Sequence, residues 1–228
     1  MLTSGAVYNR CKKAPDFAHF CPINGMGTIQ FMPNQPPIDI ENPLISVFAG
    51  GGVDRFLTWF MKPDSKTPSG YYIKDDTFNI QAELINYLQK AQTVYLTLDY
   101  EYMEGRYGRD SMVTLLAVTG CSQNAGWVSK TARSVTKSGE FPVYQNGTII
   151  NMRGHLHDGG VSIELFINNQ SICNSKAEYG GKEGSFTDDS GKVWESISKM
   201  STCEDSIKVT KGDKISMVAY YDTELHPL

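Results

Sequence analysis

Two of the four histidines in this 228-residue chain stand one residue apart, in the stretch RGHLHDGG. In an extended strand alternate side chains share a face, so His155 and His157 would lie together with their Cα atoms about 7 Å apart. Two imidazoles at that spacing can converge on one ion, and imidazole suits copper, zinc, iron and nickel. Asp158 and two glycines follow, which predicts a tight turn after the pair. The stretch is a candidate metal site.

The pattern around the pair predicts which face of the strand it occupies. In TIINMRGHLHDGG every second position from Ile150 belongs to one set: Ile150, Met152, Gly154 and Leu156. This mainly apolar set should face the core, which places both histidines on the wetter face. Arg153 shares that face. We interpret it as an arginine that points into solvent from the strand.

A third ligand does not follow from spacing. No cysteine or carboxylate at ligand spacing completes a site locally, although Asp158 is adjacent to the pair. His226 is the candidate third nitrogen, because it follows the strand-like DKISMVAYYD and could return to the same sheet. His19 is too far along the chain to be placed by spacing. The plainer interpretation, two surface histidines beside a hairpin turn, stays open.

Composition excludes several classes of function. Apolar residues make up 40% of the chain and charged residues 20%, as in ordinary soluble globular proteins. The net charge of −4 does not favour nucleic acid or an anionic membrane as a partner. No apolar run approaches the length of a transmembrane helix. The Walker lysine of a phosphate-binding loop and the GxSxG motif of a serine hydrolase are both missing.

Other features point to an extracellular protein. Five cysteines occur without a CxxC pair for zinc. Two glycosylation sequons begin at Asn146 and Asn169. The N-terminal MLTSGAVYNRCKK lacks the apolar core of a signal peptide. We therefore expect an export signal that precedes this chain.

Strand patterns dominate, so the sequence predicts an all-β protein built from antiparallel, sandwich-like units. Period-two alternation marks residues 93–102 and 160–169. In SIKVTKGDKISMVAYYD two strands should flank a turn at Lys211-Gly212-Asp213, and MVTLLAVTG, from Met112, suits a strand buried on both sides. FNIQAELINYLQKA, from Phe78, is ambiguous and favours a strand. The glycine-rich residues 180–191 predict a surface loop.

The sequence predicts a division of the chain within EGRYGRD, residues 104–110. It separates an N-terminal β unit, residues 1–108, from a C-terminal β-sandwich, residues 109–228. The second unit is the more complete and contains the histidine pair.

Four motifs then follow one another in a familiar order: GHLHDGG, CNSKAEYGG, ISKMSTCED and VTKGDKISMVAYYDTELHP. They resemble the C-terminal half of a secreted fungal family that is similar to the plant stress-upregulated nodulin proteins. That family in turn resembles the copper type II, ascorbate-dependent monooxygenases, such as peptidylglycine α-hydroxylating monooxygenase. The resemblance covers about residues 69–228 and is strongest over residues 153–228.

The resemblance implies two jelly-roll-like domains that each carry one copper ion. His155 and His157 match the His-x-His pair of the C-terminal copper site. The expected methionine ligand follows a turn that matches residues 224–227, so its position lies beyond Leu228. Met200 and Met217 do not stand at the matching place. The resemblance therefore implies copper held by the two histidines, with His226 as a possible third ligand.

The N-terminal copper site of those monooxygenases would require several histidines. Ala18-His19 and Asn86-Tyr87 occupy the matching positions, and His19 is the one histidine among them. The resemblance thus implies a degenerate electron-transfer site, and a two-copper hydroxylase is not expected. His19 is best interpreted as a loop histidine.

The resemblance also implies a disulfide between Cys173 and Cys203. Cys11 and Cys21 could pair locally, which would leave Cys121 as a buried thiol. The leading hypothesis is a secreted copper-binding protein with possible hydroxylating activity on a small-molecule or peptide substrate. The alternative is a non-catalytic β-sandwich, either a binding or a cell-surface module.

Overall fold

The computed structural model describes residues 58–62, 66, 68–73, 86, 90–114, 116, 118, 131–143 and 145–227. Nearly every regular element among them is a strand, and the predicted all-β, antiparallel architecture is confirmed. His19, Cys11, Cys21 and Cys121 lie outside these residues. So does almost all of the strand predicted from Phe78.

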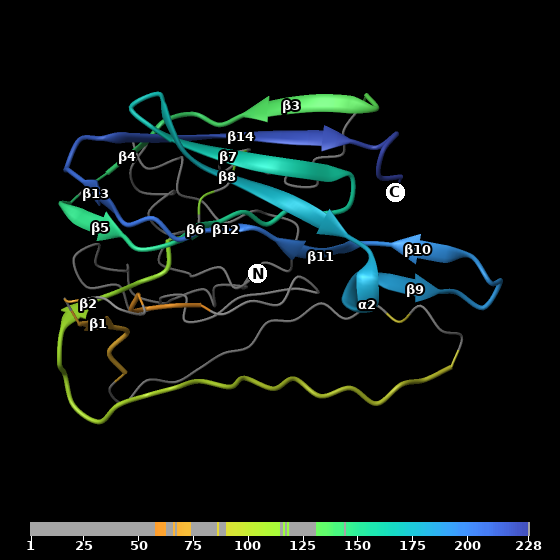
Figure 1. Cartoon of the computed structure of the whole chain (residues 1–228), viewed down its shortest axis with the longest axis horizontal. Coiled ribbons are helices and arrows are strands. Elements are labelled where there is room, and N and C mark those ends of the chain that lie inside the picture. The colour runs from red at the N-terminus through yellow and green to blue at the C-terminus, as the bar shows by residue number, and fades with distance from the viewer. Residues whose placement is uncertain are drawn as a thin grey trace, which may run out of the picture.

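The main sheet contains the longest strands, and its neighbouring strands run antiparallel (Figure 1). Its strand order is β11-β8-β7-β14-β3. These strands are β3 (Arg133–Lys137), β7 (Gly160–Ile167), β8 (Gln170–Tyr179), β11 (Ile197–Met200) and β14 (Lys214–Asp222). The short β4 (Phe141–Pro142) pairs with the beginning of β14.

A second layer is formed by two short antiparallel pairs, which lie below β7 and β14 in Figure 1. β5 (Gly147–Ile149) pairs with β13 (Ile207–Val209). β6 (Met152–Arg153) pairs with β12 (Thr202–Cys203). The buried side chains form one cluster: Phe141, Leu156, Ile163, Ile197, Met200, Met217 and Ala219. The layers and this core make a sandwich-like fold.

The alternation predicted for β7 is largely confirmed. Ile163 is buried, and Leu165 packs against the core cluster. Val161 and Ile167, near the ends of the strand, stay half-exposed. The strand therefore contributes mainly its central residues to the core.

The strands predicted on either side of Lys211-Gly212-Asp213 are both present, as β13 and β14. Gly212 has a φ of 99°, which glycine adopts readily. However, β13 pairs with β5, whereas β14 pairs with β7 and β3. The turn therefore joins the two layers of the sandwich and closes no hairpin.

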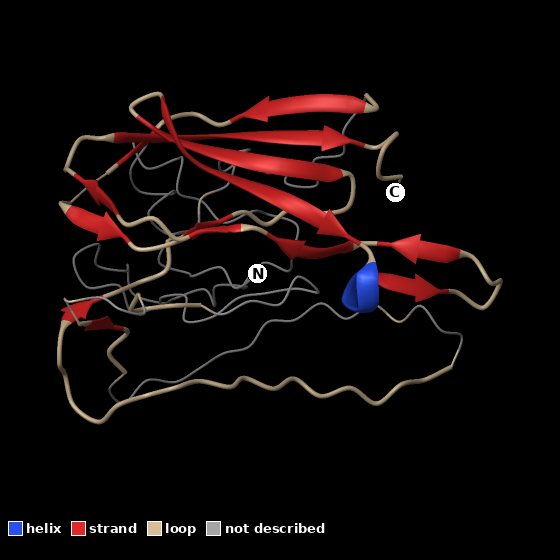
Figure 2. Ribbon diagram, in the orientation of Figure 1, coloured by secondary structure: helices blue, strands red, loops and turns tan. Residues whose placement is uncertain are grey.

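Two predicted strands are wrong for the residues that the structure describes. Residues 93–102 run as an extended loop (Figure 2), and Tyr95 is 86% exposed. The alternation of these residues indicates which side chains would share a face. A strand also needs a neighbouring strand with which its backbone exchanges hydrogen bonds. The described part of MVTLLAVTG forms no strand either. Leu116 and Val118 nevertheless pack against the core cluster.

The stretch predicted as a surface loop over residues 180–191 has more structure than expected. It holds the four-residue helix α2 (Gly181–Gly184) and strand β9 (Ser185–Thr187). β9 forms a hairpin with β10 (Val193–Glu195). Glycines at positions 180, 181 and 191 have positive φ values, which explains why the segment looked like a loop.

The segment before residue 111 contacts the second layer. β1 (Ser69–Gly70) and β2 (Arg109–Asp110) form a parallel pair. The Asn151 side-chain amide donates to the carbonyl of Trp59 at 3.3 Å, and Lys62 donates to the carbonyl of Glu204 at 2.7 Å. The predicted division into residues 1–108 and 109–228 stays a prediction.

The disulfide between Cys173 and Cys203 is present, as the resemblance implied. Cys173 lies on β8 and is 4% exposed, while Cys203 lies on β12. Their Cα atoms are 5.7 Å apart. The bridge therefore fastens the main sheet to the second layer.

Replacing both cysteines, as Cys173→Ala/Cys203→Ala, should lower the free energy of unfolding by about 3 to 4 kcal/mol. The bridge spans 30 residues, and the chain-entropy account gives about this value for such a loop. Denaturant unfolding of the variant and the oxidised wild type measures the difference. Reduced wild type should have the same unfolding midpoint as the variant. Equal unfolding midpoints for the variant, the reduced wild type and the oxidised wild type would contradict the prediction.

Candidate metal centre

The predicted parity around the histidine pair is confirmed. Met152 and Leu156 are 6% and 7% exposed, and Gly154 between them is also buried. His155 is half-exposed and His157 is exposed. The strand itself, β6, ends at Arg153, so the inward and outward alternation continues beyond the paired backbone.

Gly154 lets this segment lie directly on the main sheet. A Cβ atom at this position would stand 2.0 Å from the Cγ2 atom of Ile163. The Gly154 amide donates to the hydroxyl of Ser175 at 3.0 Å, and that hydroxyl donates to the carbonyl of Ser201 at 2.6 Å. The glycine before the pair is therefore required by close packing.

The tight turn predicted after the pair is also confirmed. The Gly160 amide donates to the carbonyl of His157 at 3.0 Å, and Gly159 has a φ of 85°. Asp158 Oδ1 accepts hydrogen bonds from the Ser196 hydroxyl at 2.9 Å and from the Ile197 amide at 3.0 Å. These contacts connect the turn to the beginning of β11.

The two imidazoles are close enough to share one ion. Their ring centroids lie 5.4 Å apart, with the ring planes at 78° to each other. A metal–nitrogen bond of about 2 Å puts each ring centre about 3 Å from the ion, so two rings on one ion have centres within about 6 Å. The His155–His157 pair meets this condition, and its nitrogen donors suit copper.

His226 returns to the same end of the main sheet as the histidine turn. Its ring stacks on Tyr179, with the centroids 3.6 Å apart and the planes at 4°. The Tyr179 hydroxyl donates to the carbonyl of Gly160 at 2.8 Å. The backbone amide of His226 donates to the carbonyl of Asp222 at 3.0 Å. Tyr179 thus contacts both the turn and His226.

The histidines do not form a ready three-ligand site. Among the described residues, no group of three or more histidine, cysteine, aspartate or glutamate side chains is placed to hold a metal ion. His226 as a third ligand stays a prediction. Met200 and Met217, at 1% and 3% exposure, belong to the core cluster.

Two tyrosines beside the turn were not recognised as site residues in the sequence. Burial raises the pKa of Tyr179, and the negative charge of Asp158 raises this pKa further. Burial also raises the pKa of Tyr221, and a hydrogen bond from the backbone of His157 offsets part of this rise. Both phenols therefore keep their protons to higher pH than an ordinary tyrosine does. In the sequence Tyr179 stands within CNSKAEYGG, one of the motifs that carry the family resemblance.

The other predicted positions lie away from the pair or stay untested. Asn146 and Asn169, the two sequon asparagines, are exposed. The Asn146 side-chain oxygen accepts from the Lys211 amide at 2.8 Å. Asn86 is exposed, and Tyr87 lies outside the described residues.

Comparison with known proteins identifies the family. A family model described as "Stress up-regulated Nod 19" matches residues 113–226, half of the chain, and this range includes the histidine pair, the disulfide and His226. The chain belongs to the stress up-regulated Nod 19 family. No solved structure matches this Nod 19 family chain.

Two curated relatives carry names that refer to copper. The chain is 28% identical over 179 residues to "Probable copper-dependent oxygenase clz3" of Cochliobolus lunatus, covering 77% of this chain and 56% of that protein. It is 28% identical over 179 residues to "Probable copper-dependent oxygenase M1" of a Phoma species, covering 77% and 45%. The Nod 19 family chain thus spans about half the length of these relatives. Within its described part, no helix has the length and apolar character needed to cross a bilayer.

Gly154→Ala should destabilise the protein by about 1 to 3 kcal/mol, because the added methyl group overpacks the contact with Ile163. Gly147→Ala is the matched control, since a Cβ atom there would meet its nearest neighbour at 3.9 Å. Urea unfolding measures both variants. Equal midpoints for the two would show that the segment does not lie against the sheet as described.

The raised pKa of Tyr179 predicts a loss of stability at alkaline pH. The unfolded chain releases this proton near pH 10, while the folded protein retains it to higher pH. The free energy of unfolding should therefore fall as pH rises above about 10. Tyr179→Phe should show a smaller fall in urea unfolding between about pH 8 and 11.

Tyr95→Phe, on an 86% exposed side chain, is the matched control for removing a phenol. An alkaline loss of stability that is the same in wild type and Tyr179→Phe would contradict the assignment to Tyr179.

Proposed function

We propose that this chain binds one copper ion through His155 and His157 as part of a secreted, copper-dependent oxygenase. The observation that carries the proposal is the placement of the two imidazoles. Their centroids are 5.4 Å apart on the outward face of a segment whose alternate residues are buried. The names of the two relatives favour copper among the metals that imidazole binds.

His226 is the proposed third ligand. The hydrogen bond from its amide to Asp222 holds its backbone at the end of β14, and its ring is half-exposed. To bind an ion beside the pair, the ring would leave the face of Tyr179. Copper, when bound, supplies the one-electron redox chemistry with oxygen that such an oxygenase uses.

The chain's own residues would prepare this site. Leu156 is buried between the two histidines and sets their outward direction. The Tyr179 hydroxyl donates a hydrogen bond to the carbonyl of Gly160, which holds the backbone of the turn. A small-molecule or peptide substrate would meet the exposed imidazole of His157 first.

An extracellular setting is part of the proposal. The disulfide between Cys173 and Cys203 suits an oxidising compartment. Both sequon asparagines, Asn146 and Asn169, are exposed and would be open to glycosylation.

A second candidate function is a non-catalytic β-sandwich that binds a partner or serves at the cell surface. It is favoured by a specific observation: only two imidazoles come together, and no third ligand group joins them among the described residues. The buried positions of Met200 and Met217 leave neither thioether beside the pair at the surface.

A Cu(II) titration of metal-stripped protein, followed by electron paramagnetic resonance, tests the proposal. Wild type should bind copper with sub-micromolar affinity and show nitrogen hyperfine coupling. His155→Ala/His157→Ala should lose this binding and its spectrum while keeping the melting temperature close to wild type. His226→Ala should bind more weakly and lose the coupling of one nitrogen.

Thr148→Ala/Lys208→Ala is the matched control, because it removes two exposed side chains that face each other across β5 and β13. This control should bind copper as wild type does. Weak binding that is equal in wild type and the double histidine variant would reject the copper site and favour the binding module.

A further inference from the structure

The histidine pair lies on a segment that no strand pairing holds. β6 ends at Arg153, and β7 begins at Gly160. Residues 154–157, which lie between these two strands, are not part of a strand. The relative position of the two imidazoles therefore depends on contacts made at each end of this short span.

At its first end the span is fixed by Gly154. Its amide donates to Ser175, and its Cα lies so close to Ile163 that no Cβ fits. Leu156 adds a side chain to the core cluster. These contacts fix the backbone up to Leu156 and turn both histidines outward. The orientation of His157 relative to His155 depends in addition on the turn that follows.

Asp158 fixes the second end. It is the residue next to His157, and one of its carboxylate oxygens accepts from both the Ser196 hydroxyl and the Ile197 amide. Ile197 is 5% exposed and begins β11 within the core cluster. Hydrogen bonds to a carboxylate are stronger than neutral ones. The turn is thus anchored to one of the most buried positions of the fold.

Other contacts hold the backbone of His157, which accepts from the Gly160 amide and hydrogen-bonds Tyr221, and the far half of the turn. The Tyr179 hydroxyl donates to the carbonyl of Gly160, and the Asp222 amide donates to the carbonyl of Gly159. Both of these carbonyl groups belong to residues that follow Asp158 in the chain. Loss of Asp158 would remove the hydrogen bonds that join the turn to Ser196 and to the beginning of β11.

We infer that Asp158 is a positioning residue, which fixes the direction of His157 relative to His155 by anchoring their turn to Ser196 and Ile197. This inference rests on the proposed copper function. Asp158 acts through hydrogen bonds to the protein and does not ligate the ion. The acidic residue in GHLHDGG thereby has a role distinct from that of the two histidines.

Three variants separate this role from others. Asp158→Ala removes the acceptor. Asp158→Asn keeps a side-chain carbonyl oxygen that can accept both hydrogen bonds but removes the charge. Ser196→Ala removes only one of the two donors, so it remains informative if Asp158→Ala does not fold.

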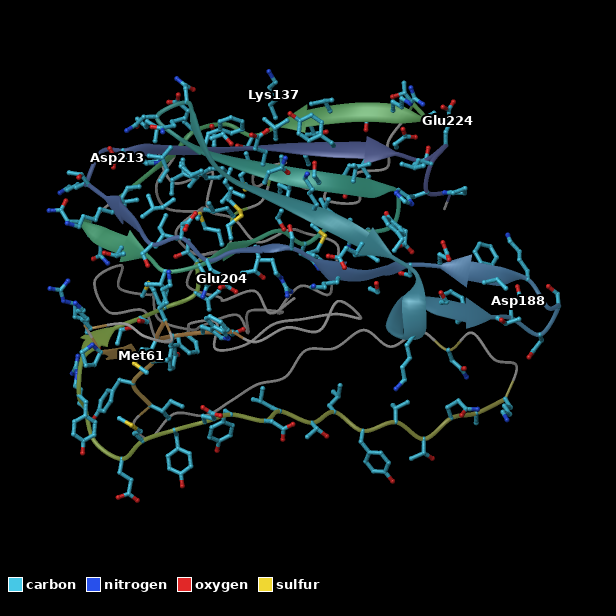
Figure 3. All side chains as sticks on the ribbon, viewed as in Figure 1. Met61, Lys137, Asp188, Glu204, Asp213 and Glu224 are labelled. Atoms are coloured by element: carbon cyan, nitrogen blue, oxygen red, sulfur yellow. A yellow bond between two sulfur atoms is a disulfide. The ribbon has the colours of Figure 1, made fainter. Side chains whose placement is uncertain are left out.

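Asp213→Ala is the matched control. Asp213 makes a comparable anchor, accepting from the Thr210 amide at 2.7 Å and from the Asn168 side chain at 3.0 Å. Asp213 and Glu224 lie at opposite ends of β14 (Figure 3), and the turn contacts the end near Glu224. The control therefore loses an anchor far from the histidine pair.

The first measurement uses metal-free protein. Asp158→Ala should speed hydrogen exchange of the Ile197 amide and shift the imidazole NMR signals of His157. Asp213→Ala should leave both close to wild type. Asp158→Asn, whose neutral oxygen accepts weaker hydrogen bonds than a carboxylate, and Ser196→Ala should both fall between. If Asp158→Ala changes neither the hydrogen exchange of the Ile197 amide nor the NMR signals of His157, the inference is overturned. This holds whether or not the protein binds copper.

The second measurement is the dissociation constant for Cu(II), with its electron paramagnetic resonance spectrum. Asp158→Ala should weaken binding by about 10- to 100-fold, as loss of an orienting partner typically does, with broadened nitrogen coupling. Asp158→Asn should bind with an affinity between those of wild type and Asp158→Ala. A loss in Asp158→Asn equal to that in Asp158→Ala would show that the charge itself acts on the ion and would overturn the positioning role.

Failure of the proposed function gives a different result. Wild type would then not bind copper tightly, while the metal-free signals of His157 and Ile197 would still respond to Asp158→Ala. The anchoring of the turn and the binding of copper are thus tested separately.

Discussion

The packing of Gly154 and Leu156 onto the main sheet is the contact on which the rest of the site depends. No side chain fits between Gly154 and Ile163, and Leu156 is 7% exposed within the core cluster. Because neighbouring side chains of an extended segment point to opposite faces, burying these two residues directs His155 and His157 outward. The hydrophobic core thus sets the direction of the candidate ligands, without strand pairing at the histidines themselves.

Polar groups from several strands then meet at one end of the main sheet. Asp158 accepts from the beginning of β11, Tyr179 at the end of β8 donates to Gly160, and the end of β14 donates to Gly159. Together these contacts fix the turn that follows His157. A preformed arrangement of this kind lowers the conformational entropy lost on binding an ion.

Local alternation made the outward direction of the histidines predictable, because it depends only on which residues are apolar. The same reasoning placed β7 and β14. It failed for residues 93–102. Alternation indicates which side chains of a segment would share a face, but it does not indicate which strand would pair with that segment. The contacts of Asp158 with Ser196 and Ile197 join residues 38 and 39 positions apart. No local pattern encodes such a pairing, so the role of Asp158 and Tyr179 required the structure.

The stack of His226 on Tyr179 bears directly on whether the pair gains a third ligand. An aromatic pair of this kind is worth about 0.5 to 1.5 kcal/mol beyond the area it buries. If His226 leaves the stack to bind an ion, that energy is subtracted from the binding free energy. Since about 1.4 kcal/mol corresponds to a tenfold change in affinity, the stack weakens binding by about tenfold or less. In the proposed copper site the two outward imidazoles would therefore set most of the affinity, and Tyr179 would adjust how readily His226 adds to it.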